Sequence, residues 1–166
     1  MKRYFNNPIS KIRSQRRARC VNLKKNTKSI GSSELYNLVR AQAFAPGHAI
    51  STDDNVYLLL DEKVLKKMLK RDGTDKLKYR KEGGDCDDFA EILNGRVKEQ
   101  AMLCDFDKGA AFGTVAGQLY EVGQENPVNH KMNIVVTTKR EVWLVEPQND
   151  KWFRPDKRNE YWYIIV

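Results

Sequence analysis

The residues best suited to chemistry lie in the segment GGDCDDFAEI, residues 83 to 92, where a cysteine stands between acidic residues directly after two glycines. From Cys86 onward, apolar residues recur at spacings of three and four, which predicts a helix over residues 86 to 104. Asp85 suits the N-cap position. Cys86 would lie in the first turn, where free backbone N–H groups and the helix dipole favour an anion. The neighbouring carboxylates oppose ionisation, so a reactive thiol here requires a cationic partner.

A histidine is the natural partner for such a thiol, and the chain has two. His130 begins the segment HKMNIVVTT, in which every second residue from His130 to Val136 is suited to one face of a strand against a core. His48 lies before Cys86 in a Pro/Gly turn, PGHAI, and is the weaker candidate. The sequence therefore favours His130 as the partner of Cys86.

The next segment, EVWLVEP, predicts a second strand that forms a hairpin with the first. A two-residue loop of Lys139 and Arg140 is disfavoured, because such loops prefer Gly or Asn. A loop with an odd number of residues, such as 138 to 140, would put His130, Glu146 and Gln148 on one face. Either Glu146 or Gln148 would then orient the imidazole, although a salt bridge from Glu146 to an arginine is an alternative.

A cysteine at a helix N-terminus, a histidine on a later strand and an acid or amide on the next strand match the nucleophile, base and orienting group of papain-like cysteine enzymes. GGDCDDFAEI also resembles the GDC(E/D)D(Y/F)A signature of bacterial and phage transglutaminase-like cysteine peptidases, over roughly residues 79 to 150. This resemblance implies a thiolate nucleophile at Cys86 and a general base at His130. Where that family often carries Asp, this chain has Glu146 or Gln148, and the Gln that precedes the papain-like nucleophile is absent.

Elsewhere, the apolar spacing predicts helices over residues 33 to 44 and about 61 to 73, and EYWYIIV predicts a final strand. With the hairpin, these elements predict an α+β fold of papain/transglutaminase type, in which helices pack on an antiparallel β-sheet. The glycines at positions 109, 113, 117 and 123 are expected to mark strand bends and turns, because they lack the Lys and Ser/Thr of a phosphate loop.

The formal charge of +8 is concentrated at the N-terminus. Residues 1 to 33 contain ten Lys or Arg and no acid, whereas the remainder has 20 basic and 22 acidic residues. We therefore expect a basic flexible arm over residues 1–33 and one domain over 34–166. Residues 2–28 could contact nucleic acid or an acidic partner, or form only a solvated tail.

From these observations we expect a cysteine-dependent amide-bond hydrolase that forms a thioester at Cys86, with His130 as general base and a peptide or protein as substrate. The alternative is a non-catalytic papain-like scaffold that binds nucleic acid or an acidic protein through its arm. No cofactor and no metal are expected, since the acidic residues lack the spacing of an EF-hand loop and the His and Cys residues lack the spacing of a zinc site. With no span of membrane length and no secretion signal, a cytoplasmic location with reduced thiols is expected.

Overall fold

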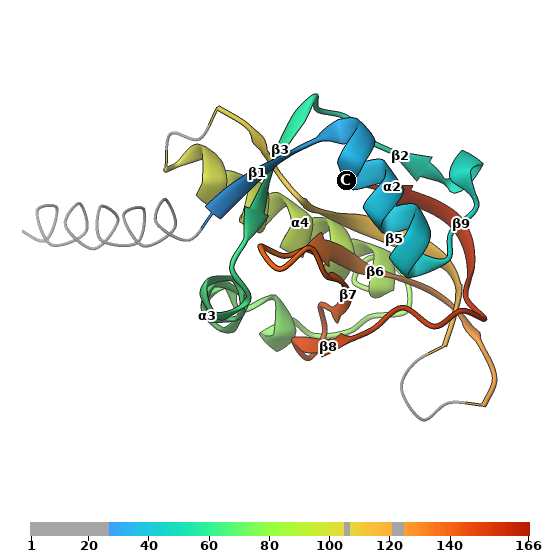
Figure 1. Ribbon diagram of the computed structural model, residues 1–166. Helices are drawn as coiled ribbons and strands as arrows, with labels where there is room; N and C mark the ends of the chain where they lie inside the picture. Colours follow the sequence, from blue (N-terminus) through green and yellow to red (C-terminus); the bar gives the residue numbers. More distant parts are fainter. Residues whose placement is uncertain (1–26, 105–106, 121–124) are drawn as a thin grey trace, which may run out of the picture.

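The computed structural model describes residues 27–104, 107–120 and 125–166, and it is built on a six-stranded sheet (Figure 1). The strand order is β2-β9-β5-β6-β7-β8. The bounds are β2 Ile50–Ser51, β5 Phe112–Leu119, β6 Val128–Val136, β7 Val142–Glu146, β8 Lys151–Phe153 and β9 Glu160–Ile165. All neighbouring strands pair antiparallel except β2 and β9, which are parallel.

A second sheet of three strands has the order β1-β3-β4, with bounds β1 Thr27–Gly31, β3 Val56–Leu60 and β4 Gly109–Ala110. Strands β1 and β3 are antiparallel, whereas β3 and β4 are parallel. The predicted single antiparallel sheet is therefore wrong, because the described residues form two sheets and both are mixed. The parallel pairs involve the two-residue strands β2 and β4, which are too short to produce a readable alternation of apolar residues.

The three predicted helices are confirmed: α2 Ser32–Ala43, α3 Glu62–Asp72 and α4 Cys86–Met102. Two single-turn 3₁₀ helices, η1 Gly47–Ala49 and η2 Thr74–Lys76, follow α2 and α3. The side chain of Asp61 caps α3 by accepting hydrogen bonds from the backbone N–H groups of Lys63 and Val64. Gly73 ends the helix in the left-handed conformation, with φ of 76°.

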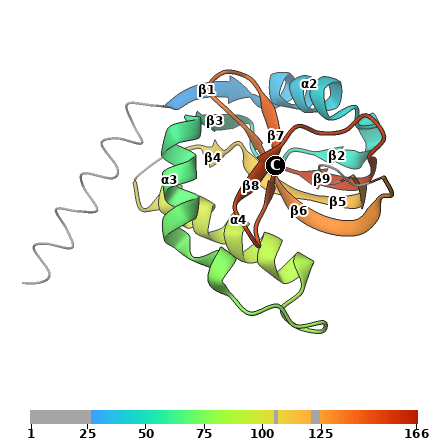
Figure 2. The same cartoon turned by 90° about the horizontal axis from the view of Figure 1, so that it is seen from below.

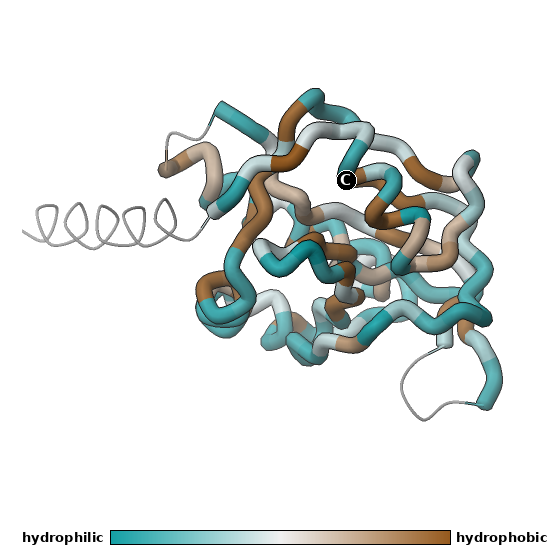
Figure 3. Tube along the Cα trace, in the orientation of Figure 1, coloured by the Kyte–Doolittle hydropathy of each residue, from teal (hydrophilic) through white to brown (hydrophobic). Residues whose placement is uncertain are grey.

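Each face of the six-stranded sheet is covered by a separate hydrophobic core. The core under α2 contains Leu35, Met132 and Ile134, whereas the core under α3 and α4 contains Leu93 and Val135. Figure 2 shows α2 on one side of the sheet and α3 with α4 on the other. In Figure 3 the most hydrophobic parts of the trace follow inner strands, and the outer loops are hydrophilic. Successive residues of β6 therefore face different helices.

The central strand β5 contains two glycines that allow the close passage of β9. A Cβ atom on Gly113 would lie 1.8 Å from the carbonyl oxygen of Ile165, and one on Gly117 would lie 2.1 Å from that of Glu160. The pairing of β5 with β9 shifts register between Ala116 and Gly117. Sequence reasoning assigned these glycines to bends and turns and did not identify the strand that carries them.

Part of the predicted arm lies inside the fold. Residues 27 to 31 form β1, in which Ile30 is buried, and α2 begins at Ser32. The basic residues before position 27 lie outside the described residues, so a separate arm there stays a prediction, as does the cytoplasmic location. Among the described residues, none of the helices combines the length and the apolar character that crossing a bilayer requires.

Candidate functional site

Cys86 is the first residue of α4, as the sequence predicts. The chain turns into this helix through Gly83 and Gly84, whose φ angles are 73° and 142°, values that favour glycine. Asp85 occupies the N-cap position with extended backbone, but its side chain forms no capping hydrogen bond. Cys86 has a free, half-buried thiol. Cys104 is disulfide-bonded, so the expectation of reduced thiols throughout is wrong.

Three carboxylates surround the helix start. One oxygen from each of Asp85, Asp87 and Asp88 lies within 4.8 Å of the others. A hydrogen bond between Asp85 and Asp87 raises the pKa of Asp85 and lowers that of Asp87. Such a group could ligate a hard cation such as Ca²⁺, which prefers oxygen ligands. However, Asp87 is exposed, and proton sharing between neighbouring acids also accounts for their proximity.

His130 and Glu146 form the tightest polar pair of the predicted site residues. The distance from His130 Nε2 to Glu146 Oε2 is 2.6 Å, and only 11% and 8% of the two side chains is exposed. The backbone N–H of Gln148 donates to Glu146 Oε1 over 3.1 Å. The three residues thus lie together, with Glu146 as the group that contacts the imidazole. Gln148 takes part through its backbone.

The hairpin loop explains why His130 and Glu146 share a face. Val136 pairs with Val142, and Thr137 N–H donates to the carbonyl of Glu141. Residues 138 to 140 therefore form the three-residue loop that the sequence favoured, and Arg140 ends it with φ of 63°. A left-handed residue at this position is typical of three-residue hairpin loops.

The helix that carries Cys86 is attached to the strand that carries His130. The buried Asn133 amide of β6 donates to the carbonyls of Ala90 and Gly113, over 2.9 and 3.0 Å. Lys131 forms an ion pair of 2.6 Å with Glu91 of α4. Although burial opposes it, hydrogen bonding to Glu91 raises the pKa of Lys131. Sequence reasoning missed both contacts, because a lone polar residue in a strand does not reveal its partner.

The thiol and the imidazole are not joined by a hydrogen bond in the described parts of the chain. Lys131 and Asn133 reach α4, whereas Met132 and Ile134 pack in the core under α2. The structure thus brings together His130, Glu146 and Gln148, and it places Cys86 at the start of α4, the helix that is attached to the strand of His130.

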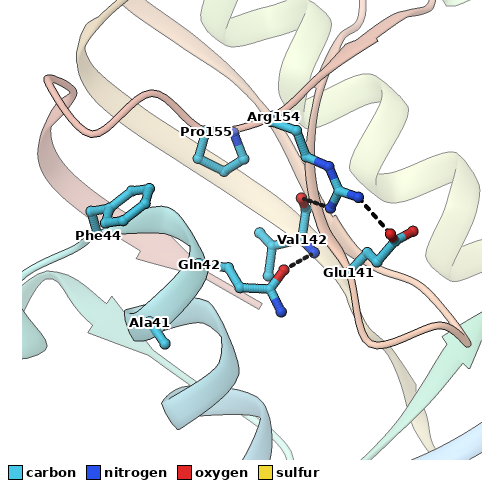
Figure 4. Close-up of a pocket in the computed structure, with 7 residues that line it drawn as sticks. All are labelled: Ala41, Gln42, Phe44, Glu141, Val142, Arg154 and Pro155. Atoms are coloured by element: carbon cyan, nitrogen blue, oxygen red, sulfur yellow. Dashed lines mark hydrogen bonds and ion pairs between the residues drawn. The ribbon is translucent and has the colours of Figure 1, made fainter.

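An open hollow of about 570 Å³ lies apart from these residues, between the end of α2 and strands β7 and β8 (Figure 4). Its lining consists of Ala41, Gln42, Phe44, Glu141, Val142, Arg154 and Pro155. Sequence reasoning missed it, because its residues come from segments about 100 positions apart.

A family model described as agglutinin C-terminal matches residues 57–152 of the sequence. This match covers more than half of the chain. The chain belongs to the agglutinin C-terminal family. No curated protein matches the agglutinin-type chain.

Two solved structures resemble the fold of this agglutinin-family chain. One is titled "PSL1a-E64 complex", with a TM-score of 0.69, 19% identity and coverage of 83% of this chain and 51% of that one. The other is Polyporus squamosus lectin bound to the human-type influenza-binding epitope Neu5Aca2-6Galb1-4GlcNAc, with a TM-score of 0.67, 19% identity and coverage of 83% and 49%. At this identity the likeness concerns the fold. The chain spans about half the length of both proteins.

These comparisons correct the assignment to transglutaminase-like cysteine peptidases. The matched family is agglutinin C-terminal, and the fold is a mixed, sheet-rich fold shared with about half of each of the two solved structures, instead of papain-like helices on an antiparallel sheet. The predicted amide-bond hydrolase at Cys86, its peptide substrate and the nucleic-acid-binding alternative are therefore not supported. The physical reason is that GGDCDDFAEI also satisfies the ordinary needs of a helix start: a sharp turn, an N-cap acid and negative charge in the first turn.

Proposed function

We propose that this chain is a glycan-binding module of an agglutinin-type protein. The observation that carries this proposal is the family match over residues 57–152, which extends from β3 through most of β8. The fold it shares with Polyporus squamosus lectin adds support, since that lectin is bound to a glycan in its structure. Our proposal for this chain extends only to the ligand class, a glycan. The particular epitope is that of Polyporus squamosus lectin.

The surface of the domain has groups that suit saccharides. Exposed aromatic rings, such as Phe44, Tyr79 and Trp162, offer apolar faces on which a sugar ring can pack. Exposed carboxylate and guanidinium groups offer hydrogen-bond acceptors and donors for hydroxyls. A site of this kind combines apolar contact with a few fixed polar groups.

The test is a glycan array probed with the intact chain, followed by isothermal titration calorimetry with the best glycan. We expect saturable binding to a restricted set of glycans. Because the chain carries a formal charge of +8, binding is repeated at about 0.5 M salt, where contacts with acidic glycans through charge alone are screened. Binding to none of the glycans, or binding that disappears in salt, would contradict the proposal.

A second proposal concerns the predicted site residues, and the 2.6 Å contact between His130 and Glu146 favours it. We infer that Cys86, His130 and Glu146 serve one polar centre, in which Glu146 orients the imidazole and the imidazole promotes ionisation of the thiol. Support comes from the free thiol at the start of α4 and from the contacts that hold α4 on β6. Gln148 contributes its backbone N–H to the carboxylate. Contacts of this kind commonly tighten only when a ligand binds.

The rate of alkylation of Cys86 by iodoacetamide at about pH 6 tests this centre, because an ordinary thiol reacts slowly there. We expect His130→Ala to slow the reaction at least tenfold. The disulfide-bonded Cys104 serves as an unreactive internal reference in mass-spectrometric mapping. Equal rates in the two proteins would show that His130 does not act on the thiol.

A further inference from the structure

Three carboxylates from separate segments of the chain act on one another beside the 3₁₀ helix η2. Asp72 ends α3, Asp75 lies in η2, and Asp150 lies in the turn between β7 and β8. One oxygen of each side chain, Asp72 Oδ2, Asp75 Oδ1 and Asp150 Oδ1, is buried and has no hydrogen-bond partner among the described residues. A buried acceptor without a donor is costly, so these three oxygens require an explanation.

The positive charges around the cluster do not balance its acids. Arg96 of α4 donates through Nη1 to Asp72 Oδ1, over 3.1 Å, and to the carbonyl of Asp72, over 2.6 Å. Asp150 experiences the negative charges of Asp75 and Asp72 and the positive charge of Lys76, whose side chain is exposed. With all three acids ionised, three anions would therefore face two cations in a partly desolvated place.

A proton on Asp150 removes this imbalance. Burial first, and then the charges of Asp75 and Asp72, raise the pKa of Asp150 to about 6 from an ordinary value of 3.8. Below that pH, its carboxyl group can donate to an unpartnered oxygen of Asp75 or Asp72, so that one proton is shared between two buried oxygens. Above that pH the three carboxylates repel one another.

The helix η2 anchors the segment that precedes Cys86. Residues 76–83 are exposed, and in Figure 2 the chain between α3 and α4 stands away from the rest of the domain. Leu77 N–H donates to the carbonyl of Thr74, over 3.0 Å, and the backbone N–H of the buried Thr74 donates to Asp72 Oδ1, over 2.9 Å. The position of the segment therefore depends on η2.

The other side of the cluster adjoins Glu146. Asp150 follows Gln148 by two residues, and the backbone N–H of Gln148 donates to Glu146 Oε1, over 3.1 Å. Glu146 pairs across the turn with Lys151, whose side chain is exposed. A contact between Asp150 and η2 therefore connects the segment before Cys86 with the turn that follows Glu146.

We propose that Asp72, Asp75 and Asp150 form a proton-operated latch between η2 and the β7–β8 turn. With one proton in the cluster the latch is closed, and residues 77–85 are held in place. When the proton is lost, repulsion separates η2 from the turn and releases the segment in front of Cys86. The latch does not depend on which ligand the domain binds, so it goes beyond the proposed function.

The test is amide hydrogen exchange, followed by NMR at about pH 5 and about pH 7.5, with EDTA present and with rates corrected for the intrinsic pH dependence of exchange. The reporters are the hydrogen-bonded N–H groups of Thr74, Leu77 and Arg80. In the intact chain, their protection should fall about tenfold more between the two pH values than that of residues 132–136 in β6. This size follows from the raised pKa of Asp150, reduced for its partial exposure.

Two substitutions in the cluster should remove the pH response. Asp150→Asn should keep the latch closed at both pH values, because its amide does not ionise and can donate to the carboxylates. Asp75→Asn should also lose most of the response, because it removes one of the repelling charges. Asp156→Asn is the matched control, since Asp156 forms its ion pair with Arg158 outside the cluster, and it should respond as the intact chain does.

A response that both cluster variants abolish and Asp156→Asn retains would support the latch. An absent response in the intact chain, or one that persists in either cluster variant, would overturn it. Equal losses of protection at the reporters and in β6 would also overturn it, because the whole domain would then be opening.

Discussion

Glu146 contacts His130 with one carboxylate oxygen and the backbone N–H of Gln148 with the other. Both partners are needed, because the carboxylate is almost fully buried. Glu146→Gln keeps the shape but replaces one acceptor by a donor, so it should destabilise the fold by about 1–3 kcal/mol. Urea unfolding at pH 7, followed by tryptophan fluorescence, measures the change.

Gln148→Ala is the matched control, because it leaves the backbone N–H in place. Its effect should stay within about 0.5 kcal/mol. A larger loss in Gln148→Ala than in Glu146→Gln would assign the orienting role to the Gln148 side chain instead.

Among the polar residues of the sheet, Asn133 should be the one whose substitution destabilises the fold most. Its amide donates to two buried carbonyls, one on α4 and one on β5. Asn133→Leu leaves both without this donor and should cost about 1–3 kcal/mol. Hydrogen exchange should rise selectively in the first half of α4. Asn129→Leu, at an exposed position of the same strand, should have little effect, and a comparable loss there would argue against the role of the two bonds.

Asp150 should make the domain more stable at acidic pH than at neutral pH. Burial, assisted by the charges of Asp75 and Asp72, raises its pKa to about 6 from an ordinary value of 3.8. The folded state therefore binds this proton more tightly than the unfolded chain, so stability is lost as pH rises from 4 through 6. The shift corresponds to about 3 kcal/mol before screening, and partial solvent exposure reduces this to about 1 kcal/mol.

Asp150→Asn removes that ionisation and should stabilise the domain at pH 7.5 but not at pH 4.5. Asn tolerates the left-handed φ of 57° at this position. Asp156→Asn is a control of opposite sign, because hydrogen bonds from Arg158 lower the pKa of Asp156 to about 2. The stability that the ionised Asp156 carboxylate contributes is present above pH 4 and is lost only as the pH falls through about 2. Asp156→Asn should therefore be less stable than the unmodified chain at both pH 7.5 and pH 4.5. The free energy of unfolding at the two pH values decides the matter.

Two glycine-to-alanine substitutions should have opposite effects on the stability of the domain. Gly113→Ala places a Cβ 1.8 Å from the carbonyl oxygen of Ile165, which forces β9 to move and should cost about 3 kcal/mol. Gly95→Ala on α4 meets nothing within 4 Å and should stabilise the helix by about 0.5–1 kcal/mol. Thermal unfolding of both variants measures this. A stable Gly113→Ala protein would mean that β9 does not pass this close to β5.

The sequence by itself determined the local structure around the candidate residues. Helical spacing and capping residues placed Cys86 at the start of α4, and the chemistry of tight turns placed His130 and Glu146 on one face of the β6–β7 hairpin. These features depend on residues within about twenty positions of one another, where backbone geometry fixes which side chains share a face.

Only the tertiary structure decided which distant segments meet. The pairing of β5 with β9, the attachment of α4 to β6 through Asn133, and the hollow between Phe44 and Arg154 all join segments 40 or more positions apart. Such contacts depend on the shapes of complete surfaces, which the periodicity of one segment does not contain. The same limit explains the mistaken family: a motif of seven residues describes how a helix begins, whereas the family is defined by how about one hundred residues pack together.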